Sequence, residues 1–268
     1  MSTDTARHAF GQPIRRKEDA RLLLGQGRFT ADIVPPGAAR AVVIRSSHAH
    51  ADILAIDTAA AAAMPGVLAV LTGADYAADG LGGITPGTPL IRLPGTPADQ
   101  DFLHRPVHPA LAHGRVRHVG EAVAIVVAET EAQARDAAEA VTVDYAPLAS
   151  VTDTAAAARP GAPLVWEEAP GNACFVWQAG NAAATDAAFA AAAHTVRLDT
   201  LNNRIHVGSL ETRGAIGSFA DGRYTLATGT QMPHGLKEAL ADELHGLYDR
   251  TNLATIARFP QGQPAAPK

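Results

Sequence analysis

Few residues of this sequence could take part in chemistry by their type and spacing, and two histidines come first. His48 and His50 stand close together in the segment SSHAHA, at the end of an apolar run. Imidazole is a common zinc ligand, but no cysteine lies nearby to complete a metal-ligand set. We therefore expect a loop whose imidazoles hydrogen-bond the backbone, and we assign no metal ligand.

A glycine-rich segment near the N-terminus is the second candidate. The spacing Gly25-x-Gly27-x-x-Thr30 approaches that of the loop that holds the pyrophosphate of a dinucleotide. Such a loop follows a strand and has a third glycine, and this segment has neither. We interpret the segment as a turn.

Composition excludes several kinds of site and partner. Cys174 is the only cysteine among the 268 residues, so an internal disulfide and an all-cysteine metal or iron–sulfur site are excluded within this chain. The 22 basic and 27 acidic residues give a formal net charge of −5, and no basic field favours nucleic acid or an anionic membrane. The N-terminus is polar, and no apolar run approaches the roughly 18 residues that cross a bilayer. We expect a cytoplasmic protein.

Among the elements that could position these side chains, residues 115–148 form the best-defined unit. Ala122–Ala128 is a short, continuously apolar run, typical of a strand buried on both faces. Thr130 stands at an N-cap position with Gln133 three residues later, and the alanine-rich sequence that follows predicts a helix. Val141–Tyr145 alternates apolar and polar residues, the pattern of a strand with one wet face. The predicted order is strand, helix, strand.

A similar order is predicted earlier in the chain. A strand is expected at Ala39–Arg45, and a short alanine helix follows Asp57 or Thr58, either of which can cap it. A second strand is expected at Val67–Leu71. Tyr76–Gln100 is rich in glycine and proline without a sustained period, which predicts a long surface loop.

Beyond the segment Arg159–Pro163 the predicted elements are shorter. Strands are expected at Asn172–Trp177, Thr195–Leu201, Leu210–Phe219 and Tyr224–Thr228, and helices from Thr185 to Ala193 and from Gly235 to Leu244. Asp221-Gly222 marks a hairpin turn. From His245 the periodicity is lost, and the final QGQPAAPK is typical of a disordered tail.

Several segments together carry a family resemblance, and they lie in order between Pro13 and Leu244. They are RRKEDARLLLGQGRFTADI, VVIRSSHAHADILAIDTAAAAAMPGVLAVLTGAD, VRHVGEAVAIVVAETEAQARDAAEAVTVDYAPL, APLVWEEAPGN, HTVRLDTLNNR and ATGTQMPHGLKEALADEL. This pattern resembles the N-terminal part of the large, molybdopterin-binding subunit of the xanthine dehydrogenase and aldehyde oxidase family, especially its carbon-monoxide-dehydrogenase-like branch.

The resemblance implies an α+β fold in two domains. It implies an α/β hammerhead domain over residues 21–148, preceded by an extended arm at 1–20. A linker at 149–172 is then expected to join the hammerhead to residues 173–244, the start of a mixed α/β molybdopterin-binding domain that is incomplete here. Residues 245–268 are expected to form a divergent, disordered tail.

The resemblance also implies chemistry and partners. In this family a molybdenum–molybdopterin centre inserts oxygen from water into a C–H bond of an aldehyde or N-heterocycle, or oxidises carbon monoxide. Electrons leave through iron–sulfur clusters and FAD, and the single cysteine agrees with those carriers lying on other subunits. The expected partners are iron–sulfur and FAD subunits, with neither nucleic acid nor membrane.

One cofactor-binding residue follows from the resemblance. Gln231, in the segment GTQ, matches the family glutamine whose side-chain amide donates a hydrogen bond to an oxygen ligand of molybdenum. A neutral amide can orient such an oxygen without adding a competing charge. The alternative is a glutamine that satisfies backbone groups at a strand end. Glu211 also lies in a family-like segment, and we interpret it as structural, paired with Arg213 or Arg204.

The chain departs from the family pattern after Leu244. The glycine-rich GGGFG loop expected after the last helix is missing, and so is the glutamate that acts as general base. We assign no catalytic residue and expect a truncated or split oxidoreductase subunit, inactive without a complementing large-subunit chain. The alternatives are a non-catalytic assembly module and a remnant of such a subunit.

Overall fold

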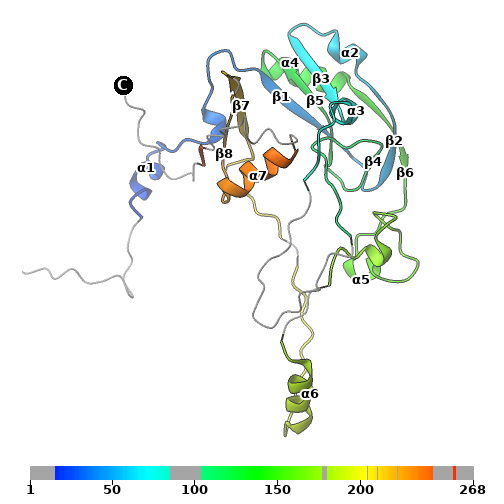
Figure 1. The fold of residues 1–268 in the computed structure, drawn as a ribbon. Coiled ribbons are helices and arrows are strands. Elements are labelled where there is room, and N and C mark those ends of the chain that lie inside the picture. The colour runs from blue at the N-terminus through cyan, green and yellow to red at the C-terminus, as the bar shows by residue number, and fades with distance from the viewer. Residues whose placement is uncertain are drawn as a thin grey trace, which may run out of the picture. The chain divides into compact units, whose positions relative to one another are not determined.

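The computed structural model of the protein describes residues 16–84, 104–176, 180–203, 205–209, 211–221, 223–243 and 256–257 (Figure 1). The chain divides into two compact units. The larger unit contains Gly37–Val207, and the smaller unit joins the described part of Met1–Pro36 to Gly208–Ala241. The N-terminal segment therefore folds with residues that are far from it in the sequence.

The centre of the larger unit is a three-stranded antiparallel sheet with the order β1-β5-β3, here called sheet A. Its strands are β1 (Arg40–Arg45), β5 (Ala122–Ala128) and β3 (Val67–Thr72). The apolar run predicted to be a buried strand is the central one, and Val126 in its middle is fully buried between Val42 and Val70. Central placement gives β5 a hydrogen-bonded neighbour on each edge, which suits its β-branched sequence.

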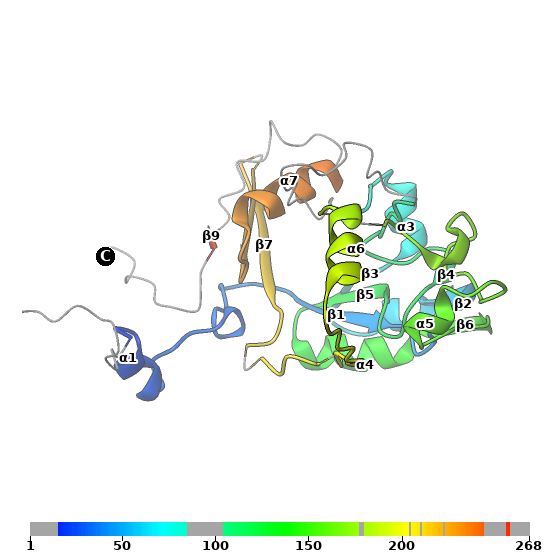
Figure 2. The same ribbon diagram turned by 90° about the horizontal axis from the view of Figure 1, so that it is seen from below.

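Helix α4 (Glu131–Ala140) covers one face of sheet A (Figure 2). The Thr130 hydroxyl accepts a hydrogen bond from the backbone N–H of Gln133 at 3.3 Å and donates one to Gln133 Oε1 at 2.7 Å. The predicted N-cap is therefore confirmed. Ala134 and Ala137 are fully buried, and these small side chains allow α4 to approach the sheet closely.

A second three-stranded antiparallel sheet, sheet B, has the order β4-β2-β6. Its strands are β4 (Arg115–Val116), β2 (Ala51–Asp57) and β6 (Thr142–Pro147). Helix α2 (Ala59–Ala62) links β2 to β3, and Asp57 caps it by accepting a hydrogen bond from the Ala59 N–H at 2.9 Å. Because β2 pairs with β6 and β3 with β5, the two strand–helix–strand segments interlock, and each gives one strand to each sheet.

The predicted loop at Tyr76–Gln100 begins differently from the expectation. Tyr76 belongs to helix α3 (Gly73–Ala78), which follows β3 directly. Ile84 then exchanges backbone hydrogen bonds with His108, at 2.9 and 3.0 Å. The rest of the predicted loop lies outside the described residues.

The segment 149–172, expected to be a linker, is folded locally. It contains helix α5 (Thr154–Ala157) and the short 3-10 helix η2 (Pro170–Asn172). The Asn172 amide donates to the carbonyls of Ala157 and Pro163 at 2.9 Å each, and its oxygen accepts from the Val165 N–H at 2.9 Å. One side chain thus replaces the backbone pairing that this irregular segment lacks.

Three predictions for the following segment are wrong in the described residues. Asn172–Val176 forms no strand, because Asn172 closes η2 and its side chain serves the loop before it; Trp177 lies outside the described residues. Helix α6 (Ala182–Ala191) begins and ends earlier than expected, because Asn181 and not Thr185 caps it, accepting from the Ala184 N–H at 2.9 Å. The alternating segment Thr195–Leu201 is exposed and has no strand partner.

The smaller unit is built on an antiparallel hairpin of β7 (Ala215–Ala220) and β8 (Arg223–Thr228), with the short β9 (Ile256–Ala257) parallel to β8. The predicted hairpin turn is confirmed, and Asp221 has a left-handed φ of 51° there. Strand β7 begins later than the expected Leu210. Helix α1 (Asp19–Leu23) and the 3-10 helix η1 (Thr30–Asp32) lie in the N-terminal segment, and α7 (Pro233–Glu243) follows β8.

The predicted terminal segments lie mainly outside the described residues. Of the expected arm at 1–20, residues 16–20 are described and lead into α1, and of the expected tail only β9 is described. The four predicted boundaries between the five segments stay predictions. None of the helices in the described ranges is both long and apolar enough to span a lipid bilayer.

Candidate functional site

Gln231 lies in the smaller unit, on the short connection between β8 and α7. The Thr230 hydroxyl accepts a hydrogen bond from the Met232 N–H at 3.2 Å, and the Met232 carbonyl accepts one from the Leu236 N–H at 2.9 Å. These bonds define the connection and the start of α7. Gln231 itself is exposed, and across the described ranges its side-chain amide has no hydrogen-bond partner. The amide is therefore not used to satisfy backbone groups at the strand end.

Glu211 bonds to the N-terminal segment of the smaller unit. Its Oε1 accepts hydrogen bonds from the Thr30 N–H at 3.0 Å and from the Thr30 hydroxyl at 3.2 Å. The expected ion pair with Arg213 does not form, and Arg204 lies outside the described residues. Because the contact joins positions 181 apart in sequence, Glu211 fastens η1 to the residues before β7. Arg213 as the partner was wrong and Arg204 stays untested, whereas the interpretation of Glu211 as a structural residue agrees with this bond.

The turn that carries Gln231 lies close to Glu211. A Cβ atom placed on Gly229 would stand 3.8 Å from Glu211 Oε2, an ordinary van der Waals separation. The arrangement offers the exposed, neutral amide of Gln231 as a hydrogen-bond donor. The nearby Glu211 carboxylate already accepts hydrogen bonds from Thr30. It fits a single hydrogen bond to an oxygen-rich cofactor. It does not fit a metal held by protein ligands, since no group of three His, Cys, Asp or Glu side chains suited to a metal occurs among the described residues.

The two histidines singled out by their spacing have structural contacts in the larger unit. His50 is buried, and its Nδ1 lies 3.0 Å from the carbonyl oxygen of Ala149, so the expected backbone bond is confirmed for this residue. His48 instead packs its ring 4.8 Å from that of Tyr145. Both contacts hold the loop after β1 to β6 and the residues beyond it.

A cluster around Trp166 was not anticipated from the sequence. The Arg117 guanidinium carbon lies 3.7 Å from the centre of the Trp166 ring, and the rings of His104 and His108 lie 5.5 and 6.0 Å away. Burial lowers the pKa of Arg117, and the buried Glu121 carboxylate accepts a hydrogen bond from its backbone N–H. These contacts anchor the folded segment 149–172 to the strands of the larger unit. Trp166 and Arg117 are far apart in sequence, and no local pattern links them.

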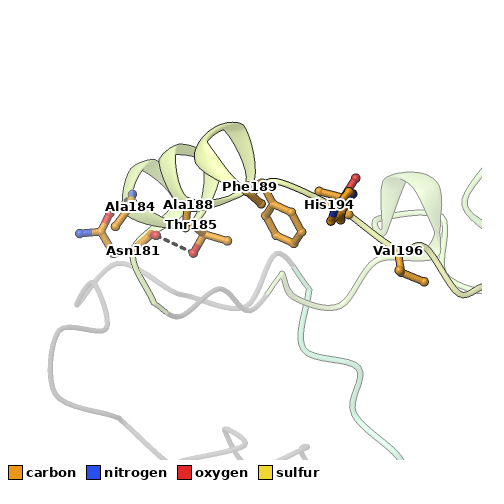
Figure 3. A pocket seen from close by; sticks show the side chains of 9 residues that line it. Asn181, Ala184, Thr185, Ala188, Phe189, His194 and Val196 are labelled. Atoms are coloured by element: carbon orange, nitrogen blue, oxygen red, sulfur yellow. Dashed lines mark hydrogen bonds between the residues drawn. The ribbon is translucent and has the colours of Figure 1, made fainter.

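An open groove of about 560 Å³ runs between α6 and residues 194–196 (Figure 3). Its lining combines three alanines with Phe189, Val196 and the polar Asn181, Thr185 and Thr195, and His194 is the one titratable side chain in that lining. Such a groove brings no nucleophile, base or ligand set together. We do not regard it as an active site.

Two known domains match this chain. Residues 24–149 match "Aldehyde oxidase and xanthine dehydrogenase, a/b hammerhead domain", and residues 165–251 match "Molybdopterin cofactor-binding domain". The chain belongs to the xanthine dehydrogenase and aldehyde oxidase family. The predicted family and its α+β hammerhead fold are therefore confirmed, and the molybdopterin-binding domain carries Gln231.

Curated relatives in this family are large subunits. The nicotine 6-hydroxylase large subunit of Paenarthrobacter nicotinovorans is 34% identical over 90% of this chain and 28% of that protein. The carbon monoxide dehydrogenase large chain of Hydrogenophaga pseudoflava is 36% identical over 84% of this chain and 28% of that protein. The chain thus spans less than a third of the length of these relatives and corresponds to their N-terminal part.

Solved structures of the family share the fold. The Cu,Mo-CO dehydrogenase structure has a TM-score of 0.72 at 32% identity, covering 90% of this chain and 30% of the solved chain. Quinoline 2-oxidoreductase from Pseudomonas putida 86 has a TM-score of 0.71 at 34% identity, with 89% and 29% covered. More than two thirds of each solved chain has no counterpart here.

Proposed function

We propose that this chain provides the N-terminal portion of a molybdenum hydroxylase large subunit, in which Gln231 is one of the residues that hold the cofactor. When bound, the molybdenum–molybdopterin centre supplies the oxidation that places oxygen from water on an aldehyde, an N-heterocycle or carbon monoxide. The observation that carries the proposal is the exposed Gln231 amide, which is without a partner in the described ranges and lies in a domain of molybdopterin-binding type.

The role of Gln231 follows from its chemistry and position. An amide N–H₂ donates hydrogen bonds without carrying charge, so it can orient an oxygen of the cofactor without changing the local charge balance. The turn that carries it is held by the hydrogen bonds of Thr230 and Met232, and it lies near Glu211. The donor is therefore held in place before the cofactor arrives, which reduces the entropy lost on binding.

The general base, most of the cofactor contacts and the electron carriers are assigned to other polypeptides. A general base and most cofactor contacts belong to the two thirds of the family fold that this chain does not span. Electron carriers belong to iron–sulfur and FAD subunits, because a single cysteine cannot ligate a cluster. By itself the chain is then inactive.

Metal analysis and turnover test this proposal. The chain is co-expressed with the uncovered part of the Hydrogenophaga pseudoflava large chain, and molybdenum content and oxidation of carbon monoxide, an aldehyde or hypoxanthine are measured. We expect no stoichiometric molybdenum in the chain alone and a roughly 10–100-fold loss of activity of the complex on Gln231→Ala. Gln26→Ala, another exposed glutamine of the smaller unit, is the matched control and should have no effect. Molybdenum with turnover in the isolated chain would contradict the proposal.

A non-catalytic assembly role is the second candidate, and one observation favours it. In the larger unit His50, Arg117 and Glu121 make structural contacts, so these side chains serve the fold. This role predicts that Gln231→Ala leaves both partner recovery and any activity of the complex unchanged.

A further inference from the structure

Sheet A has a second face, opposite to α4, and its composition is unusual. Across the three strands, Val43 pairs with Ile125, which pairs with Leu71, and these side chains form one row. The next row on that face is Ala41, Val127 and Ala69. We call these two rows the outer face of sheet A. These two rows contain no polar or charged side chain, the exposed Arg45 lies beyond them at the end of β1, and α4 covers the alternate residues.

Within the described part of the larger unit the outer face is exposed. Leu71 is 46% accessible to solvent, Val43 is 36% accessible, and Leu68 beside the rows is 58% accessible. On the inner face, Val126 is fully buried against Ala137 of α4. The same sheet therefore has one covered and one uncovered apolar face.

Sheet B provides the internal comparison. In β6 the exposed Thr142 and Asp144 alternate with the partly buried Val143 and Tyr145, and Pro147 at the end of the strand is also exposed. An antiparallel sheet with one solvated face shows this alternation, whereas a continuous apolar run is typical of strands covered on both faces. Strand β5 is such a run, although the structure covers only its inner face. The sequence of β5 therefore predicts that another element packs on the outer face of sheet A.

We infer that the outer face of sheet A packs against the part of the large-subunit fold that this chain does not span. Two observations identify this occupant. The two rows are wholly apolar, as in permanent interfaces that resemble a domain core cut in half, whereas separate electron-transfer partners meet through smaller and more polar surfaces. In addition, solved relatives contain more than two thirds of their chain beyond the region matched here.

This inference rests on the proposed function, since it takes the remainder of the large subunit as the occupant. The two can be tested separately, because docking is measured by recovery of a polypeptide and does not require molybdenum or turnover. If the parent complex is recovered in full and its molybdenum content is unchanged by Gln231→Ala, only the role of Gln231 is rejected.

The experiment compares two surfaces of the same unit. The chain is co-expressed with the tagged, uncovered part of the Hydrogenophaga pseudoflava carbon monoxide dehydrogenase large chain, and the recovered chain is quantified. The double variant Val43→Asp with Leu71→Asp should lower recovery at least tenfold. Its melting temperature alone should stay within a few degrees of the parent, because both positions are already exposed. Thr142→Asp, at an exposed position of sheet B, should leave recovery unchanged.

Several results would overturn the inference. Unchanged recovery of the double variant would show that the outer face makes no contact. A drop of its own melting temperature by more than about 10 °C, which corresponds to several kcal/mol, would show that the face is covered within this chain. Sedimentation showing a homodimer that the double variant dissociates would identify a second copy as the occupant. In a second co-expression that adds the iron–sulfur and flavin subunits, selective loss of one of them from the double variant would identify that subunit as the occupant instead.

Discussion

Helices α4 and α6 have ten residues each, are rich in alanine and begin at a side-chain cap, yet they differ in what surrounds them. Thr130 caps α4, and Asn181 caps α6. Two alanines of α4 are fully buried against sheet A, whereas α6 has no buried residue. Capping and propensity are enough to specify a helix at both places. Only at α4 does tertiary packing add to its stability, because only there does an apolar sheet face meet the small side chains.

The largest expected effect on stability comes from placing the same charge in each of the two helices. Ala134→Asp in α4 buries an unpaired carboxylate and should destabilise the larger unit by roughly 3 kcal/mol or more. Ala188→Asp in α6, at an exposed position, should change stability by less than about 1 kcal/mol. Thermal unfolding followed by calorimetry measures both. Equal effects would show that α6 is packed as firmly as α4.

A close backbone approach in the larger unit provides the next test. Gly73, the first residue of α3, is buried, and a Cβ there would stand 2.0 Å from the carbonyl oxygen of Ala112. Gly73→Ala should therefore cost about 1–3 kcal/mol, because one of two backbone segments must move. Gly217→Ala in β7, with open space around the added methyl, should be neutral or slightly stabilising. Denaturant unfolding compares the two, and an unaffected Gly73→Ala would contradict the close approach.

Removing the caps separates helix formation from packing. Thr130→Ala and Asn181→Ala should each cost about 1 kcal/mol of helix stability. For Thr130→Ala the loss should appear in the unfolding of the whole larger unit, because α4 is part of its core. For Asn181→Ala it should appear as faster amide exchange within α6 and leave the global transition in place. A global shift from Asn181→Ala would show that α6 is coupled to the core.

The smallest expected effect concerns pH. Hydrogen bonds donated by the Thr72 side chain and backbone N–H hold the pKa of Asp75 below its ordinary value. Since the folded pKa is lower than the unfolded one, the stabilisation is present above the unfolded pKa and is lost as pH falls through the folded pKa. Asp75→Asn should weaken this acid dependence slightly, and NMR titration of the carboxyl checks the direction. A pKa at or above the ordinary value would remove the basis of the prediction.

The contrast between the two regions also explains which sequence predictions succeeded. Strand β5, the Thr130 cap and the β7–β8 turn at Asp221 were predictable, because each depends on residues a few positions apart. The expected strand at Thr195–Leu201 did not form, since alternation needs a partner strand and none is supplied in the described part of the chain. The helix at α6 was placed too late because Asn181 competes successfully with Thr185 for the cap.

The candidate site divides in the same way. Gln231 could be identified from the sequence because it lies in the short motif GTQ, which belongs to a segment that carries the family resemblance. Its role at the cofactor stays a prediction. The partner of Glu211 was not accessible, because Thr30 lies 181 positions away and no local pattern joins them. The Trp166 cluster was missed for the same reason, since Arg117 and Trp166 belong to different elements.

The sequence alone determined the family, the fold class, the central strand of sheet A and the Thr130 cap of α4, because apolar periodicity and capping act over a few residues. Tertiary structure decided which strands pair, that Glu211 binds Thr30, and that one apolar face of sheet A is covered while the other is not. The physical reason is that pairing and burial are properties of two surfaces that meet. A continuous apolar run such as β5 indicates that both faces of the strand are buried by other elements. Only the fold shows that α4 is the element that covers one of them.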